Sequence, residues 1–343
     1  MTVRVGLIGL GGISRAHALG YRRLAQAEVV AVCDSDETRA AAEAREWGAE
    51  PFLDYVALLA RRDVDAVDVM LPHSLHEEVA LAALDAGKHV LVEKPITPNV
   101  AATDRLLASA DRSGRVLAVA ENTRFVAAYQ AVEPLVRSGA LGEIQLVRTM
   151  ICGNETERLS RRDLWKGRRD GTVGGAILDA GAHSFYLLRW MFGAFEHLSA
   201  HGQRRVAESE VEDFGVVVGR LRTGADFVTE FSFTAEIPWN ERLEVYGSAG
   251  SMIVDQLADP VVKRFRNSRD YTGEALEVAY APRTWKHDSI ADEVVDFVTA
   301  LDEGRRPLVD LHQVRDAMEG LELAYRSMED GGELISVADG RSR

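Results

Sequence analysis

The fold of this chain is decided by the stretch Val3-Arg4-Val5-Gly6-Leu7-Ile8-Gly9-Leu10-Gly11-Gly12-Ile13-Ser14. Its first half predicts a short buried strand, and its second half predicts a glycine turn and the start of a helix. Gly9 suits the tight turn, and Gly11 has no Cβ, so a pyrophosphate can approach the backbone. Ser14 is small enough for the helix to pack near the strand. The helix would direct its N-terminal N–H groups at the phosphates. This spacing predicts a dinucleotide-binding turn.

An acidic residue follows the second β-rich run of the chain. That run covers residues 28–33 and is followed by Asp34, close to the offset of ~20 residues expected in dinucleotide-binding folds. A carboxylate at this place accepts a hydrogen bond from a ribose 2′-hydroxyl and repels a 2′-phosphate. The cofactor we predict is therefore NAD, although Arg39, one helical turn further on, leaves NADP open. The alternative is an ordinary glycine turn without a cofactor.

Strand-like and helical patterns alternate throughout residues 1–121. The β-branched runs are apolar on both faces, as the strands of a covered parallel sheet are. This half predicts an α/β Rossmann-type domain with a doubly wound parallel sheet, which would bind NAD(P). Strands are predicted at 3–8, 29–33, 66–71, 89–93 and 116–120, and helices at 14–25, 36–47, 55–60, 75–86 and 99–111.

The pattern changes after residue 121. Several runs now alternate polar and apolar residues without helices between them, which is typical of antiparallel strands. Residues 122–343 are therefore predicted to form a substrate-binding C-terminal α+β domain with an open, mostly antiparallel sheet. Helices are predicted at 125–138, 289–302 and 311–327, and strands at 144–149, 214–221, 226–233, 242–246, 252–254 and 261–265.

Composition restricts the class of protein. The net charge of −14 argues against nucleic acids and anionic membranes as partners. No apolar run is long enough to span a bilayer, and the glycine turn interrupts the apolar N-terminus, so we expect neither a membrane segment nor a signal peptide. The two cysteines, Cys33 and Cys152, show no disulfide framework and no metal-ligand spacing. We expect a cytoplasmic enzyme without a metal site.

Two short motifs carry residues suited to proton transfer. Glu93-Lys94-Pro95 ends a predicted parallel strand, where open α/β sheets bind their ligands. A half-buried lysine there suits proton transfer, although a surface lysine in a turn is the simpler alternative. Asp179 and His183 are four residues apart in a glycine-rich, helix-like segment at 174–192. A carboxylate beside an imidazole orients it as a general base, and a solvated Asp–His pair is the alternative.

These motifs together resemble the glucose–fructose oxidoreductase/inositol dehydrogenase (Gfo/Idh/MocA) family. The resemblance rests on the glycine turn, on Glu-Lys-Pro, and on Gly-Gly-x-x-x-Asp-x-Gly-x-His at residues 174–183. Stretches 86–90, 139–144 and 246–251 support it, so that it spans about residues 3–330. It implies NAD(P)-linked oxidation or reduction of sugars, cyclitols or related polyols. It also implies that the second domain's sheet forms the interface of a homodimer or homotetramer.

The resemblance also implies roles for individual residues. Lys94, Asp179 and His183 match the family's catalytic positions, and the bond before Pro95 is expected to be cis. Tyr186 departs from the family pattern, which often has an aspartate three residues after the histidine. The cofactor-binding residues that we predict are Gly9, Gly11, Gly12, Ile13, Asp34, Pro72, His73, His76, Glu93 and Lys94.

Other positions are weaker candidates for substrate contact. Thr123 and Arg124 follow the last parallel strand, and Arg162 and Trp165 lie in a basic loop before the Asp–His motif. Three further aromatic residues are candidates for lining a sugar site or an oligomer contact: Trp239, Tyr280 and Trp285.

The leading hypothesis is a dehydrogenase of a cyclitol or sugar that acts on a secondary alcohol. The alternatives are a keto-sugar reductase, a redox-neutral NAD-dependent glycosidase, and a non-catalytic dinucleotide-binding regulator. Loss of Lys94 or His183 would have favoured the regulator, and both are present.

Overall fold

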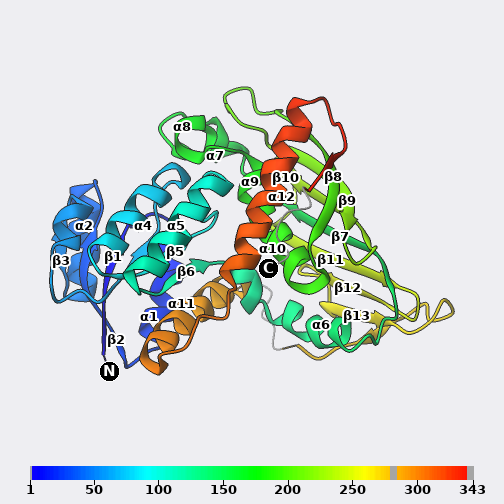
Figure 1. Ribbon diagram of the computed structural model, residues 1–343, viewed down its shortest axis with the longest axis horizontal. Coiled ribbons are helices and arrows are strands. Elements are labelled where there is room, and N and C mark those ends of the chain that lie inside the picture. The colour runs from blue at the N-terminus through cyan, green and yellow to red at the C-terminus, as the bar shows by residue number, and fades with distance from the viewer. Residues whose placement is uncertain (1, 279–283, 338–343) are drawn as a thin grey trace. The chain divides into compact units, whose positions relative to one another are not determined.

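The computed structural model describes residues 2–278 and 284–337, and these form two compact units. The first unit comprises residues 2–125 and 284–315, and the second comprises residues 126–278 and 316–337. Each unit has its own sheet (Figure 1). Tyr280, one of the weaker aromatic candidates, lies outside the described residues.

The sheet of the first unit confirms the predicted Rossmann-type fold. Its six strands are all parallel and lie in the order β3-β2-β1-β4-β5-β6, the order of dinucleotide-binding sheets. Ile8 pairs with both Cys33 and Val69, so the carboxyl ends of neighbouring strands meet at one edge. The strands are β1 (Val3–Ile8), β2 (Ala27–Cys33), β3 (Glu50–Phe52), β4 (Ala66–Val69), β5 (His89–Glu93) and β6 (Leu117–Ala120).

The helices of the first unit begin and end where the sequence provides caps. Asp36 accepts a hydrogen bond from the Arg39 N–H and caps α2, and Gly48 ends that helix with φ at +67°. Asn99 caps α5 in the same way. The elements are α1 (Ser14–Arg22), α2 (Glu37–Trp47), α3 (Tyr55–Leu59), α4 (His76–Asp85) and α5 (Val100–Ser113), with single 3₁₀ turns η1 (His73–Leu75) and η2 (Asn122–Phe125).

Helix α11 (Trp285–Glu303) packs in the first unit, beside α1 (Figure 1). Val294, Phe297 and Val298 belong to the same hydrophobic core as the β1 side chains. Arg23 at the end of α1 pairs with Asp288 and Asp292. The sequence division at residue 121 assigns this helix to the second domain, whereas the structure groups it with the first.

The sheet of the second unit is open and mostly antiparallel, as predicted. Its nine strands lie in the order β14-β13-β12-β11-β7-β10-β9-β8-β15, and among them β7 and β10 pair in parallel. The strands are β7 (Ile144–Cys152), β8 (Phe195–Gln203), β9 (Phe214–Leu221), β10 (Asp226–Ser232), β11 (Asn240–Gly247), β12 (Ser251–Asp255), β13 (Val262–Phe265), β14 (Glu274–Ala275) and β15 (Ile335–Ser336).

One face of this sheet is covered by the long buried helix α10. Phe185 on α10 packs against Phe195 and Phe227, with ring centroids 5.1 and 6.4 Å away. The helices are α6 (Ala127–Arg137), α7 (Thr156–Ser160), α8 (Arg169–Thr172), α9 (Ala176–Asp179), α10 (Gly181–Phe192) and α12 (Leu311–Glu329), with a 3₁₀ turn η3 (Trp165–Gly167). No helix among the described residues is both long and apolar enough to cross a membrane.

Candidate active site

The glycine turn has the shape that a dinucleotide requires. Gly9 has φ at +91°, and a Cβ there would collide with the carbonyl of Met70, so glycine is required. Open space surrounds the positions where Gly11 and Gly12 would carry a Cβ. The Ser14 hydroxyl donates to the Gly11 carbonyl over 2.7 Å and fixes the turn, with Ile13, against the start of α1. The residues present therefore fit a pyrophosphate close to the backbone.

Asp34 lies at the adjacent end of β2 and is bonded to this turn. Its Oδ2 accepts the Leu10 N–H over 2.9 Å, and its side chain is 8% exposed. Arg39 pairs with the same oxygen over 3.0 Å and with Asp36 over 3.3 Å. The carboxylate that we predict to bind the ribose is thus fixed in place by the backbone, and Arg39 lies directly against it.

Pro72, His73 and His76 follow β4 at the same edge of the sheet. His76 is fully buried, and its Nδ1 and Nε2 lie 2.7 Å from the Pro95 carbonyl and 2.8 Å from the Leu71 carbonyl. Burial lowers the pKa of His76. The ring therefore links the loop after β4 to the turn after β5. Since both ring nitrogens face backbone carbonyls, this geometry favours a structural role over the predicted contact with the cofactor.

The Glu-Lys-Pro motif lies at the carboxyl end of β5, which is the same edge of the sheet as the glycine turn after β1. The Lys94–Pro95 bond is cis, as the resemblance implies. The Lys94 N–H donates to Glu93 Oε2 over 2.9 Å, and the Lys94 side chain is half-buried. The other oxygen of Glu93 accepts from His17 Nε2 over 3.0 Å. Both carboxylate oxygens of Glu93 are therefore hydrogen-bonded, one to His17 and one to the Lys94 N–H.

In the second unit, Asp179 and His183 lie on either side of the junction between α9 and α10. The two residues are 7% and 4% exposed. Lys166, on η3, places its Nζ 3.1 Å from Asp179 Oδ2 and 3.3 Å from Glu155 Oε2. Its side chain is 13% exposed and lies over the ring of Phe233. Lys166 carries no distinguishing sequence signal, because it is one cation among several in that loop.

Gly175 in the second motif is explained by a half-buried glutamate, Glu212. Glu212 Oε1 accepts the N–H groups of Gly175 and Ile177 and the hydroxyl of Tyr325, the last over 2.6 Å. A Cβ on Gly175 would collide with the Glu212 carbonyl. Burial raises the pKa of Glu212 above its ordinary value. This glutamate holds the start of α9, and so the segment that carries Asp179.

The weaker candidates occupy varied places. Thr123 is buried on η2 and its N–H donates to Glu121, whereas Arg124 on the same turn is half-buried. Arg162 is exposed, and Trp165 is half-buried on η3. Tyr186 is buried and stacks on Trp190. Trp239 belongs to the second unit and Trp285 to the first.

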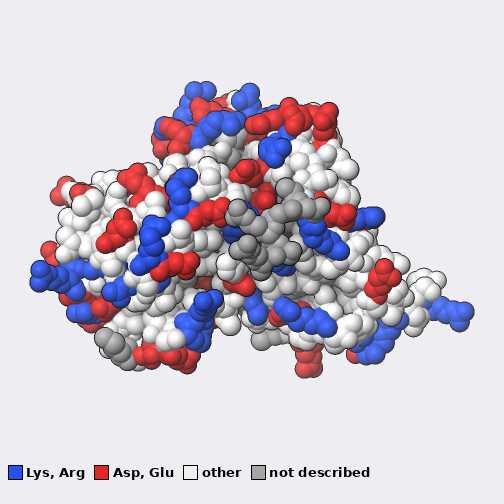
Figure 2. All heavy atoms as spheres, viewed as in Figure 1, with Lys and Arg blue, Asp and Glu red and all other residues white. Residues whose placement is uncertain are grey.

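The basic loop around α7 and α8 is neutralised by its own acids. Figure 2 shows acidic and basic side chains interspersed there rather than gathered by sign. Arg161 pairs with Asp163, and Arg168 pairs with Asp170. The loop therefore does not form a cationic patch of the kind that binds nucleic acid.

Comparison with protein families decides the classification. Residues 3–121 match the family described as "Oxidoreductase family, NAD-binding Rossmann fold", and residues 129–253 match "GFO/IDH/MocA C-terminal domain". The chain belongs to the Gfo/Idh/MocA oxidoreductase family. It is accordingly an NAD-dependent oxidoreductase, and NAD is the cofactor that the glycine turn and Asp34 fit.

Individual relatives match over most of their length. The myo-inositol 2-dehydrogenase of Thermotoga maritima is 27% identical over 98% of both chains. A dTDP-3,4-didehydro-2,6-dideoxy-alpha-D-glucose 3-reductase of Streptomyces violaceoruber is 34% identical over 75% of this chain and 74% of its own. Among solved structures, levoglucosan dehydrogenase in complex with NADH and levoglucosan has a TM-score of 0.89 over 98% of this chain and 100% of that one; at 21% identity it shows the shared fold.

Proposed function

We propose that this oxidoreductase transfers a hydride between NAD and a secondary alcohol or ketone of a cyclitol or sugar, as an inositol dehydrogenase does. The full-length similarity to a myo-inositol 2-dehydrogenase supports this substrate class. The observation that carries the proposal is the retention of Lys94, Asp179 and His183. Lys94 lies at the carboxyl edge of the cofactor sheet, whereas Asp179 and His183 are buried in the second unit, where Asp179 pairs with Lys166.

Each of these residues has a distinct role in the proposed reaction. The nicotinamide supplies the hydride acceptor or donor. In the oxidative direction, His183 removes the proton from the substrate hydroxyl, and Asp179 orients its imidazole. The Lys94 ammonium stabilises the developing alkoxide. Lys166 keeps Asp179 paired while it does so. Reduction reverses these roles.

The decisive experiment is a substrate panel. Purified protein is mixed with NAD or NADP and with inositols, glucose, xylose and glycosides, and the absorbance of the reduced cofactor is followed. NADH formation with one polyol supports the dehydrogenase and identifies its substrate class. Turnover with NADP alone contradicts the role given to Asp34. Glycoside cleavage without net NADH formation contradicts the dehydrogenase in favour of redox-neutral chemistry.

A second candidate, reduction of a keto sugar, rests on a separate observation. The Streptomyces violaceoruber relative, at 34% identity, is named a keto-sugar reductase, and a 1,5-anhydro-D-fructose reductase of Ensifer adhaerens is 30% identical over 73% of this chain. Consumption of NADH with a keto sugar, together with no NADH formation from any polyol of the panel, supports the reductive direction.

Changing Lys94 to Ala tests the catalytic assignment. We expect kcat to fall at least about 100-fold, because proton transfer and alkoxide stabilisation are lost, while the Kd for NAD changes little. Lys263→Ala, on β13, removes the same charge elsewhere and serves as the control. Steady-state kinetics and calorimetric NAD binding measure both effects. Full turnover in Lys94→Ala rules out the assignment.

We further propose that the enzyme is cytoplasmic and works as a homodimer or homotetramer. Light scattering on the purified chain measures its mass in solution, and a mass of 37.7 kDa, that of one chain, contradicts the oligomer.

A further inference from the structure

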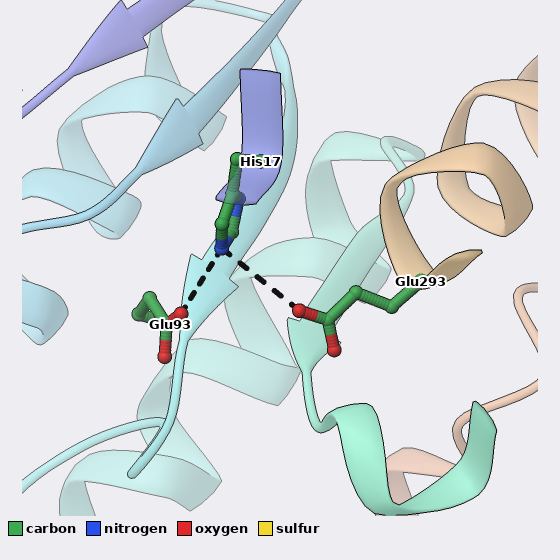
Figure 3. Close-up of side chains that lie close together, drawn as sticks. All are labelled: His17, Glu93 and Glu293. Carbon is green, nitrogen blue, oxygen red and sulfur yellow. Dashed lines mark hydrogen bonds and ion pairs between the residues drawn. The ribbon is translucent and has the colours of Figure 1, made fainter. Parts of the chain in front are cut away.

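A cluster of buried ionisable side chains adjoins the Glu-Lys-Pro motif in the first unit. His17 on α1, Glu93 on β5 and Glu293 on α11 point their polar atoms toward one another (Figure 3). One side-chain nitrogen or oxygen from each residue, of the kind that can bind a metal ion, lies within 4.8 Å of the other two. His17 is fully buried, and Glu93 and Glu293 are 9% and 3% exposed. Three segments far apart in the sequence thus meet at one imidazole ring.

Both nitrogens of that ring face carboxylates. Nδ1 lies 2.8 Å from Asp68 Oδ2, which also accepts the Tyr21 hydroxyl over 3.0 Å. Nε2 lies 3.0 Å from Glu93 Oε1. Burial alone would favour the neutral ring, but Asp68 and Glu93 outweigh it and raise the pKa of His17 well above 6.5. The ring is therefore an imidazolium that donates on both sides.

Glu93 connects this ring to the backbone of Lys94. One of its oxygens accepts from His17, and the other accepts the Lys94 N–H over 2.9 Å. Burial alone would raise its pKa, yet the hydrogen bond and charge of His17, together with Lys94 and His76, lower the pKa of Glu93. An ionised Glu93 accepts on both oxygens, so His17 holds Lys94 through it.

Glu293 completes the cluster without a hydrogen bond among the described residues. Its Oε1 lies 3.9 Å from His17 Nε2, and neither oxygen has a hydrogen-bond partner. Burial, together with the charges of Glu93, Glu121 and Asp68, raises the pKa of Glu293 well above 4.5. A proton on Glu293 removes one negative charge from this group of carboxylates. A metal ion fits less well, because the 3.0 Å contact between His17 and Glu93 places a proton where the ion would need a lone pair.

We propose that His17 is a positioning residue for the Lys94 turn: it holds the Glu93 carboxylate, which fixes the Lys94 N–H. Its effect on turnover rests on the proposed catalytic role of Lys94. A displacement of the lysine by about 1 Å can slow the chemical step about 100-fold.

The test compares full-length wild type, His17→Gln and the control His89→Gln. His89 lies in the same sheet and accepts the Val116 N–H through Nδ1, away from the cluster. We measure kcat per NAD-binding site and hydrogen exchange in the peptide that contains the Lys94 amide. In His17→Gln we expect kcat to fall about 10- to 100-fold with little change in KM. We expect the Lys94 amide to exchange at least about 10-fold faster.

A residue that served only the stability of the fold would lower the melting temperature and leave kcat per binding site unchanged. Unchanged kcat and unchanged Lys94 exchange in His17→Gln overturn the proposal, as does one equivalent of tightly held metal in the purified wild type. If the wild type turns over no substrate, the proposed function fails, whereas the exchange measurement still decides whether His17 holds the Lys94 turn.

Discussion

Lys166 shows how much a single charge matters in the second unit. It lies within 3.3 Å of two carboxylates, those of Asp179 and Glu155, and it is only 13% exposed. A single half-buried ammonium between two carboxylates attracts both of them and reduces their mutual repulsion. Without Lys166, Asp179, the acid predicted to orient His183, would lose its ion pair with this lysine.

We expect Lys166→Met to lower kcat about 10- to 100-fold, since Asp179 then reorients or takes up a proton. Arg158→Met is the matched control, because Arg158 pairs with Glu155 over 3.0 Å and is 54% exposed. Steady-state kinetics across pH measures both variants. Equal losses in the two would place the effect on Glu155 rather than on Asp179.

Residues at strand ends were predictable, and residues that complete a buried network were not. Asp34 and Lys94 are identified by their distance from a glycine turn or by the motif that contains them. His17 and Glu293 carry no such signal, because their significance arises from contacts between residues hundreds of positions apart. Lys166 was hidden among arginines whose partners are local.

At the scale of elements, α11 brings an acid into the core of the first unit. Glu293 faces His17, Glu93, Glu121 and Asp68, and its pKa is raised well above 4.5 by burial and by those carboxylates. The folded state therefore keeps a proton that the unfolded state releases near pH 4.5. Stability falls as pH rises above that value and continues to fall until the folded-state pKa is passed.

Glu293→Gln removes this dependence on pH. We expect its melting temperature, relative to wild type, to rise as the pH increases above 4.5, until the folded-state pKa of Glu293 is passed. His17, whose pKa is also raised, gives both proteins a similar slope above pH 6.5, so the difference reports on Glu293. Thermal melts followed by circular dichroism measure it. Parallel curves for the two proteins would mean that Glu293 is ionised in the fold.

Strongly patterned elements were predicted well. Strands at residues 3–8, 89–93 and 214–221 have the predicted bounds. Four strands were missed. β3 has only three residues and contains Pro51, β8 mixes histidines and a glycine with its apolar residues, and β14 and β15 have two residues each. The helix-like segment at 174–192 is divided at Ala180 into α9 and α10.

At the scale of the whole molecule, a helical pattern reveals that a helix exists but not which core it joins. The first unit is built from two distant stretches of chain. Asn122 on η2 donates to Ser289 on α11 over 2.8 Å, and α11 supplies Val294, Phe297 and Val298 to the core. The sequence could therefore predict both fold classes, but not that α11 joins the core of the first unit.

We expect residues 2–125 alone to lack a cooperative thermal transition, because their core is left open. Joining them to residues 284–315 through a flexible linker of about ten residues restores the missing helix. The hydrogen bond between Asn122 and Ser289 shows that the two ends lie close enough. Calorimetry and NAD binding compare the two fragments. A cooperative, NAD-binding fragment 2–125 would show that α11 is dispensable.

The late position of α11 in the chain also affects how the protein is made. Translation must pass through the first and larger segment of the second unit, which begins at residue 126, before the helix that closes the first core leaves the ribosome. At roughly 5–20 residues per second, this interval lasts on the order of 10 to 30 s. During that time the apolar face of α1 and β1 stays exposed on the nascent chain. Chaperones can bind this face, or it can aggregate. Synthesis speed and chaperone supply should therefore influence the yield of this enzyme.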